Sequence, residues 1–145
     1  MIPRHARRDE RGSAAVELTL LVPALVAILA LLVAGGRLWF ARATVADTAY
    51  AAARAGSIAR TSGEARSDAE QAARRSLATA GLRCANQTTS VDVSAFAVPV
   101  GTPATVRTEV SCVVSFADLL LPGTPGSITV RAAGAAALDT YRERS

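Results

Sequence analysis

The longest apolar stretch of the chain lies near its amino terminus, from Ala14 to Gly36. Leucine, valine, isoleucine and alanine dominate it, and no charged side chain occurs from Leu18 to Ala34. As an α-helix it would extend roughly 34 Å, which exceeds the hydrocarbon core of a bilayer at about 30 Å. The pattern therefore predicts a transmembrane helix over residues 13–36 and makes a buried helix of a soluble protein the weaker interpretation.

Beyond this span, residues 37–81 have the composition of helices on the far side of the membrane. Residues 38–60 are rich in alanine and arginine and contain no proline, so they should continue the membrane helix. One face of this continuation carries small residues and suits close packing on a sheet or a second helix. The members of this face are Val45, Ala49, Ala52, Ala53 and Gly56.

A second helix is predicted between a start signal at Thr61 and a stop signal at Gly81. Thr61 and Glu64 have the spacing of a capping box, in which each side chain pairs with the backbone of the other residue. The predicted apolar face comprises Ala69, Ala72, Ala73, Leu77 and Ala80. Arg66, Glu70 and Arg74 follow one another at intervals of four, which favours a solvated row of ion pairs over a binding patch.

From Ser90 onward the apolar period changes to two, which is typical of β-strands. The first predicted strand contains Val91, Val93, Ala95 and Ala97, and the second runs from Val106 to Phe116 after a break at residues 99–103. A third strand at Ile128, Val130 and Ala132 follows a turn at residues 119–123. The predicted fold is α+β: a long amino-terminal transmembrane helix continuing outside the membrane, a second helix, and an antiparallel sheet of about three strands covering the long helix.

The distribution of arginines predicts the orientation in the membrane. Arg4, Arg7, Arg8 and Arg11 precede the span, whereas only Arg37 and Arg42 follow it closely. Positive charge is retained on the cytoplasmic side. We therefore expect a single-pass protein of the cytoplasmic, or inner, membrane, with its amino terminus inside and its carboxy-terminal domain outside the cytoplasm.

The junction between the basic leader and the span has the features of a prepilin-type signal. Gly12 and Ser13 offer small residues for a cut, and Glu17 is the fifth residue after Gly12. An ordinary secretory signal has an apolar region of about 7 to 15 residues and loses it on cleavage. The Ala-x-Ala sequence at residues 41–43 lies too far beyond the apolar run to be a favoured site, whereas a cut after Gly12 would retain the span.

This junction resembles that of the TadE-like pseudopilin family of tight-adherence pilus systems. The resemblance rests on Gly12-Ser13-Ala14-Ala15-Val16-Glu17, on Pro23, on the small-residue run over residues 49–56 and on the segment over residues 117–123. Leu18 departs from the pattern, because an aromatic residue commonly follows the glutamate. The resemblance implies a non-catalytic minor pseudopilin that acts in pilus assembly or priming. It further implies that a prepilin peptidase cleaves after Gly12 and that the partners are other pilin-like subunits and the assembly machinery.

Two residues at the start of the span have alternative interpretations. Glu17 would pair with the amino terminus that cleavage exposes on a neighbouring subunit, or it would simply reach into the lipid headgroups. Pro23 would kink or loosen the helix for packing, although proline is frequent in transmembrane helices in general.

Cys84 and Cys112 are the two cysteines of the chain. In a domain outside the cytoplasm they most simply form one disulfide, with two buried free thiols as the alternative. Such a bridge would hold together a small β domain over residues 82–145. A metal site is not expected, because two thiols are too few and His5, the single histidine, lies in the leader over residues 1–12.

The remaining composition excludes several functional classes. The net charge of +4 is the difference between sixteen basic residues, all arginines dispersed along the chain, and twelve acidic ones, so it does not favour nucleic-acid binding. No phosphate-binding loop, nucleophile elbow or paired carboxylates suggest catalysis, a cofactor or a small-molecule substrate. The alternative to a pseudopilin is a single-pass, membrane-anchored extracytoplasmic binding domain that is not processed; an anchored enzyme would need a pocket that the sequence does not indicate.

Overall fold

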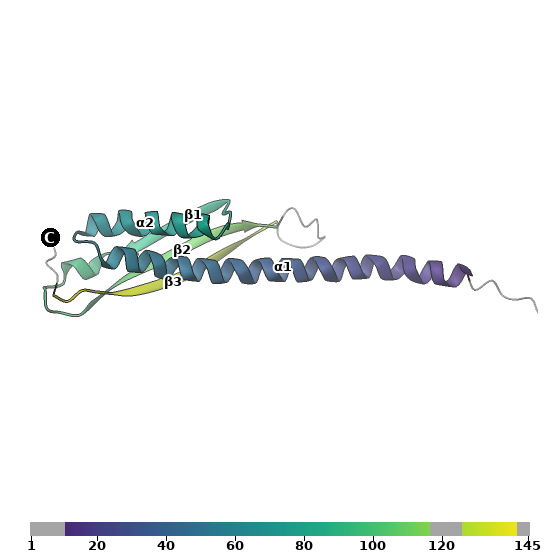
Figure 1. Cartoon of the computed structure of the whole chain (residues 1–145), viewed down its shortest axis with the longest axis horizontal. Coiled ribbons are helices and arrows are strands. Elements are labelled where there is room, and N and C mark those ends of the chain that lie inside the picture. The colour runs from purple at the N-terminus through teal and green to yellow at the C-terminus, as the bar shows by residue number, and fades with distance from the viewer. Residues whose placement is uncertain (1–10, 117–125, 142–145) are drawn as a thin grey trace, which may run out of the picture.

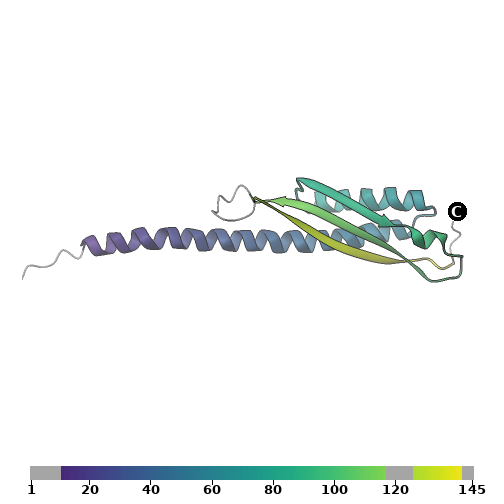
Figure 2. The ribbon, with the colours of Figure 1, turned by 180° about the vertical axis from the view of Figure 1, so that it is seen from behind.

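The computed structural model describes residues 11–116 and 126–141 and confirms the predicted α+β fold. Two helices, α1 (Arg11–Ser57) and α2 (Ser62–Thr79), precede the strands β1 (Asn86–Asp92), β2 (Ala104–Ser115) and β3 (Ser127–Leu138). A short 3₁₀ helix, η1 (Ser94–Ala97), lies between β1 and β2. Figure 1 shows both helices on one face of the sheet, and Figure 2, from behind, shows the other face uncovered. The first half of α1 projects beyond this two-layered globular part.

Helix α1 is continuous over 47 residues, which corresponds to a length of roughly 70 Å. Its second half carries the small residues predicted to pack, and all of them are buried: Val45, Ala49, Ala52, Ala53 and Gly56. These short side chains allow the sheet and α2 to approach the helix closely. The prediction that the amino-terminal apolar helix continues without a break past residue 36 is confirmed, because α1 extends to Ser57.

Helix α2 begins with the predicted capping box. The Thr61 hydroxyl accepts a hydrogen bond from the Glu64 amide at 3.1 Å, and the Glu64 carboxylate accepts one from the Thr61 amide at 3.3 Å. The helix ends before Gly81, whose φ of 71° lies in the left-handed region that favours glycine. Ala69, Ala73 and Leu77 of the predicted apolar face are buried, and so is Ala65. Ala80 is exposed, so its assignment to that face was wrong: it is the C-cap, where the helical periodicity ends.

The charged row on α2 contains one ion pair in the structure. A guanidinium nitrogen of Arg74 lies 3.7 Å from a carboxylate oxygen of Glu70, and both side chains are largely exposed. Exposed pairs of this kind contribute little to stability. This agrees with the interpretation of the row as a solvated face.

The sheet is an antiparallel meander with the strand order β1-β2-β3. Strands β2 and β3 pair along twelve residues, from Ala104 opposite Leu138 to Ser115 opposite Ser127. Buried side chains alternate along β2, as its apolar period predicted, and pack on α1 and α2. The turn at residues 119–123 and the segment 117–123 lie outside the described residues.

The first strand differs from its prediction. It begins at Asn86 and ends at Asp92, and residues 94–97 form η1 instead of continuing the strand. Asp92 causes the change, because its carboxylate accepts a hydrogen bond from the Ser94 amide at 3.0 Å and so favours a turn. Hydrogen bonds from Ser94 lower the pKa of Asp92. Ala95 is buried in a small cluster with Val106 and Leu138. The alternation of apolar residues that predicted a longer strand therefore reflects the packing of η1.

The crossing of α1 over the sheet depends on a very close backbone approach. Thr108 on β2 and Gly134 on β3 are directly opposite each other. The Thr108 hydroxyl, almost fully buried, donates a hydrogen bond of 2.7 Å to the carbonyl oxygen of Ala49. A Cβ atom at Gly134 would lie 2.6 Å from the Tyr50 amide nitrogen and still closer to that carbonyl oxygen. A residue without a side chain is therefore required at Gly134.

Cys84 and Cys112 form a disulfide, with a Cα–Cα distance of 5.2 Å and a sequence separation of 28. This confirms the disulfide and excludes two free thiols. The bridge joins the connection between α2 and β1 to β2, the central strand of the sheet. Next to it, the Ala85 amide donates to the Val113 carbonyl at 2.8 Å and extends the β1–β2 pairing.

Candidate membrane and assembly site

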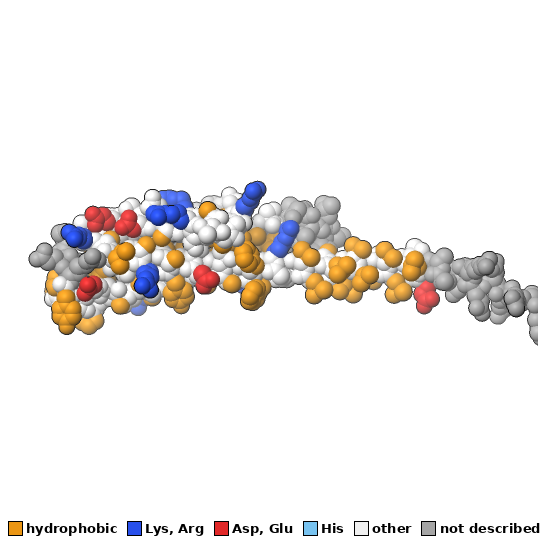
Figure 3. Space-filling view, in the orientation of Figure 1, with side chains coloured by type: hydrophobic (Ala, Val, Ile, Leu, Met, Phe, Trp, Pro, Cys, Tyr) orange, Lys and Arg blue, Asp and Glu red, His pale blue; other side chains and the backbone are white. Residues whose placement is uncertain are grey.

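The first half of α1 presents large apolar side chains to the surroundings on every side. Figure 3 shows these side chains along the projecting rod, whereas the charged ones gather on the globular part, apart from one acidic side chain near the start of the rod. Their exposed fractions lie between 49% for Val33 and 67% for Leu32. A helix that is apolar all round must be buried elsewhere, either in a bilayer or against other helices. Within the described residues, α1 is the one helix long and apolar enough to cross a membrane.

The predicted processing residues lie at the start of this helix. The backbone at Gly12 and Ser13 belongs to α1, and Glu17 is exposed on the same helix. Glu17 follows Ser13 by four residues, so about one turn, or roughly 6 Å along the axis, separates them. A cut after Gly12 would therefore create an amino terminus about one helical turn from Glu17 of the same subunit. The leader up to residue 10 lies outside the described residues.

Pro23 lies inside α1 near the beginning of the apolar half. Its nitrogen carries no hydrogen and cannot donate to the carbonyl of Thr19 one turn earlier. Figure 1 shows α1 continuing through this region as one helix. The role of Pro23 in loosening the helix stays a prediction.

The chemistry of α1 changes at the point where the helix meets the globular part. Arg37 is the first charged residue after Glu17. Trp39 is 74% exposed and Phe40 45% exposed, although the sheet and α2 are close by. Arginine and tryptophan are typical of the interface between hydrocarbon and water. The end of the span at residue 36 stays a prediction.

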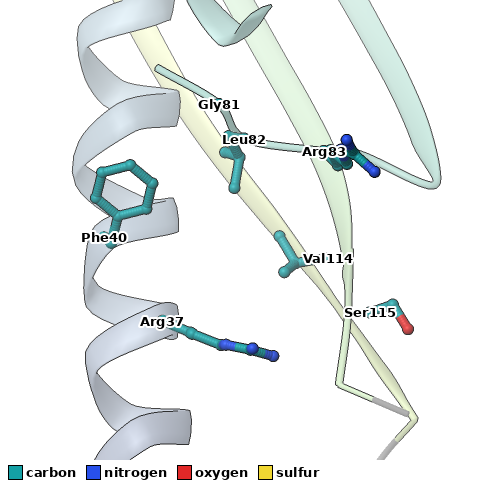
Figure 4. Close-up of a pocket in the computed structure, with 7 residues that line it drawn as sticks. All are labelled: Arg37, Phe40, Gly81, Leu82, Arg83, Val114 and Ser115. Carbon is teal, nitrogen blue, oxygen red and sulfur yellow. The ribbon is translucent and has the colours of Figure 1, made fainter. Parts of the chain in front are cut away.

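A groove of about 610 Å³ opens at this same level. It is lined by α1, by the connection from α2 to β1 and by the end of β2, through Arg37, Phe40, Gly81, Leu82, Arg83, Val114 and Ser115. Figure 4 shows Arg37 extending from α1 toward the strand that carries Val114 and Ser115. The groove therefore combines two cationic side chains with an apolar lining.

Metal-binding clusters were sought among residues 11–116 and 126–141, the part of the chain that the structure describes. No cluster of three or more histidine, cysteine, aspartate or glutamate side chains occurs there, and both cysteines are in the disulfide. The features of this surface are thus an apolar rod, a carboxylate at its start and a basic groove at its end.

Sequence reasoning missed the groove and the contact at Gly134. The groove is made by three segments that are distant in sequence, and no local pattern indicates their convergence. Gly134 carried a usable signal, because a single glycine inside a strand often marks close approach of another backbone.

Comparison with known proteins supports the interpretation of the amino-terminal helix. No curated protein and no solved structure matches the chain. Residues 12–54 match the model of the family described as TadE-like protein. The match covers the leader junction, the apolar segment and most of the helix that packs on the sheet. It confirms the resemblance drawn from the sequence, in that residues 12–54 are similar to the TadE-like family.

Proposed function

We propose that the protein is a minor pseudopilin of a tight-adherence pilus system, which acts in pilus assembly or priming and not as a catalyst. The observation that carries the proposal is the exposed apolar half of α1, preceded by the Gly12–Glu17 junction within the TadE-like match. An exposed helix of this kind can be held in the bilayer before assembly and can pack against other helices afterwards. The globular part lies outside the cytoplasm, where its disulfide is stable.

The proposed maturation step is cleavage after Gly12 by a prepilin peptidase. It removes the basic leader, leaves Ser13 as the amino terminus and retains the membrane helix. The new ammonium group then pairs with Glu17 of a neighbouring subunit. A carboxylate close to lipid is costly unless it is paired, so this contact favours association of subunits over isolated ones.

Amino-terminal sequencing of the protein extracted from the membranes of its native cell tests the processing step. We expect the sequence to start at Ser13. A start at Met1 would contradict processing and favour the unprocessed, membrane-anchored binding domain. A start beyond Ala43 would contradict both, because the span would have been removed.

The Glu17→Gln variant tests the assembly role of the carboxylate. We expect normal membrane insertion, because the change removes a charge from an apolar helix, but a loss of at least tenfold in the amount incorporated into pili. That loss corresponds to about 1.4 kcal/mol of subunit association. The measurement compares the variant protein in membranes and in sheared pili by quantitative immunoblotting.

Glu109→Gln provides the matched control, because this substitution removes the same charge from an exposed position on the sheet. It should insert and assemble as the unaltered protein does. Equal incorporation of the Glu17 and Glu109 variants would show that Glu17 merely reaches into the headgroups.

A further inference from the structure

The sheet has two edges, formed by β1 and β3. Each of these strands pairs with β2, and within residues 11–116 and 126–141 no further strand lies beside either one. Strand β3 pairs along twelve residues without interruption, contains no proline and carries one charged residue, Arg131. Proteins usually protect a long edge with proline, bulges or several charges, because its amides and carbonyls can pair with another chain. The β3 edge lacks these devices.

The hydrogen-bonding pattern shows which backbone groups point outward from these edges. The Phe116 amide donates to the Gly126 carbonyl at 2.8 Å, and this pair continues the β2–β3 register. Because antiparallel strands alternate between bonded and non-bonded pairs, the even-numbered residues of β3 bond to β2. The odd-numbered residues 127–137 of β3 therefore direct their amides and carbonyls outward. By the same alternation, the residues of β1 with outward groups are Gln87, Thr89 and Val91.

Both edge strands run in the same direction as α1. Arg37 of α1 lines the same groove as Val114 and Ser115 of β2, whereas a Cβ atom at Gly56 would lie 3.4 Å from Val106. Strand β2 therefore runs opposite to α1, and its antiparallel neighbours β1 and β3 run away from the projecting half of the helix (Figure 2). In copies anchored side by side in one membrane, every β1 and β3 strand would thus point away from the lipid. This step rests on the membrane placement in the proposed function.

The common direction limits how the edges of two copies can pair. Two like edges can meet only if one copy is inverted in the membrane or turned so that its helices lie on the opposite face. Strand β3 of one copy and β1 of the next can pair in parallel with both copies upright. Outward groups belong to residues on the uncovered face in β3 and to residues on the helix face in β1. Parallel pairing offsets such residues by one, so the helices of both copies stay on the same side.

The charges of the two strands also favour this pairing. Strand β1 carries one charged residue, Asp92, and β3 carries Arg131, and both are exposed. Asp92 already accepts a hydrogen bond from Ser94 and lies opposite Arg107, so its contribution is a general attraction and not a new ion pair. Pairing of like edges would instead bring equal charges together.

We propose that β3 of one copy pairs in parallel with β1 of a second copy, so that the sheets of neighbouring subunits join edge to edge. The three outward residues of β1 offer about six backbone hydrogen bonds to this contact. A joined pair keeps one β1 edge and one β3 edge for further copies. Such a heterologous contact repeats from subunit to subunit and adds a contact outside the membrane to that of α1.

Single-molecule photobleaching of the full chain in liposomes tests the proposal. The sequence contains no lysine, so an amine-reactive dye labels only the amino terminus. Ala133→Pro on β3 and Thr89→Pro on β1 each remove one outward amide, at a position where an edge strand tolerates proline. We expect the unaltered protein to form spots with more than two dyes, and each variant to lower the share of these spots by about tenfold.

Mixing the two proline variants, labelled in different colours, distinguishes this contact from pairing of like edges. Each variant supplies the edge that the other lacks, so we expect two-coloured pairs that do not grow further. The absence of mixed pairs would overturn the proposal. A loss of association in the β3 variant alone would also overturn it, because two β3 edges would then be paired.

Ala133→Ser and Thr89→Val are the matched controls, because they change the same side chains and keep the amides. They should associate as the unaltered protein does. Ala135→Pro and Val91→Pro repeat the experiment at a second pair of outward amides, and urea midpoints from pulse proteolysis show whether each variant is folded. An unchanged share of large spots in folded proline variants would contradict the edge pairing.

The same experiment separates this inference from the proposed function. An unaltered protein that does not insert into the liposomes would contradict the membrane placement itself. A protein that inserts but stays as single copies would contradict the edge pairing alone and leave the pseudopilin proposal intact.

Discussion

Replacing Gly134 with alanine should lower the free energy of unfolding of the globular part by about 3 kcal/mol. The added methyl group would overlap the backbone of Ala49 and Tyr50 on α1, and a helix backbone cannot rotate away as a side chain can. Overpacking of this kind costs about 1 to 3 kcal/mol. Separation of α1 from the sheet would in addition weaken the buried hydrogen bond from Thr108 to Ala49, at about 1 kcal/mol.

Pulse proteolysis of the full chain in detergent, over a series of urea concentrations, measures this loss. Gly126→Ala is the matched control, because Gly126 precedes the same strand and a Cβ atom there would have no neighbour within 4 Å. The control should change the free energy of unfolding by less than about 0.5 kcal/mol. Similar urea midpoints for the two variants would contradict the close approach of α1 to β3.

Removing the disulfide should destabilise the globular part by about 3.5 kcal/mol. The bridge closes a loop with a sequence separation of 28, and in the chain-entropy model it restricts the unfolded chain by this amount. Cys84→Ala is the better variant, because Cys112 is completely buried and its truncation would add the effect of a cavity. The same proteolysis experiment gives the free energy of unfolding.

Reduction of the unaltered protein provides an independent version of this experiment. It should lower the urea midpoint as far as Cys84→Ala does, whereas the reductant should leave the variant itself unchanged. A loss below about 1 kcal/mol in both cases would mean that helix packing alone holds the connection between α2 and β1 in place.

The features predictable from the sequence were those that depend on local chemistry. The apolar run from Ala14 to Gly36 requires a nonpolar environment whatever the rest of the chain does. The Thr61–Glu64 capping box forms within four residues, and it starts α2 as predicted. The alternation along residues 106–116 likewise predicted β2, because one face of that strand is buried and the other is exposed.

Errors and omissions arose where a local turn or a distant segment overrides the apolar pattern. The alternation at residues 93–97 reads as a strand, but the Asp92 turn ends β1 and Ala95 packs against β2 and β3 instead. The end of β3 was also placed too early, since pairing with β2 extends it to Leu138. In these segments the neighbours across the sheet outweigh the weak local preference.

The sequence by itself determined the apolar helix, the Gly12–Glu17 junction and the residues available for a disulfide. Only the tertiary structure decided that α1 crosses β3 at Gly134 and that Arg37 and Arg83 line one groove. The physical reason is the range of the interactions. Hydrophobicity, capping and thiol chemistry belong to single residues or single turns, whereas backbone contact and the convergence of charges depend on how the helices pack on the sheet.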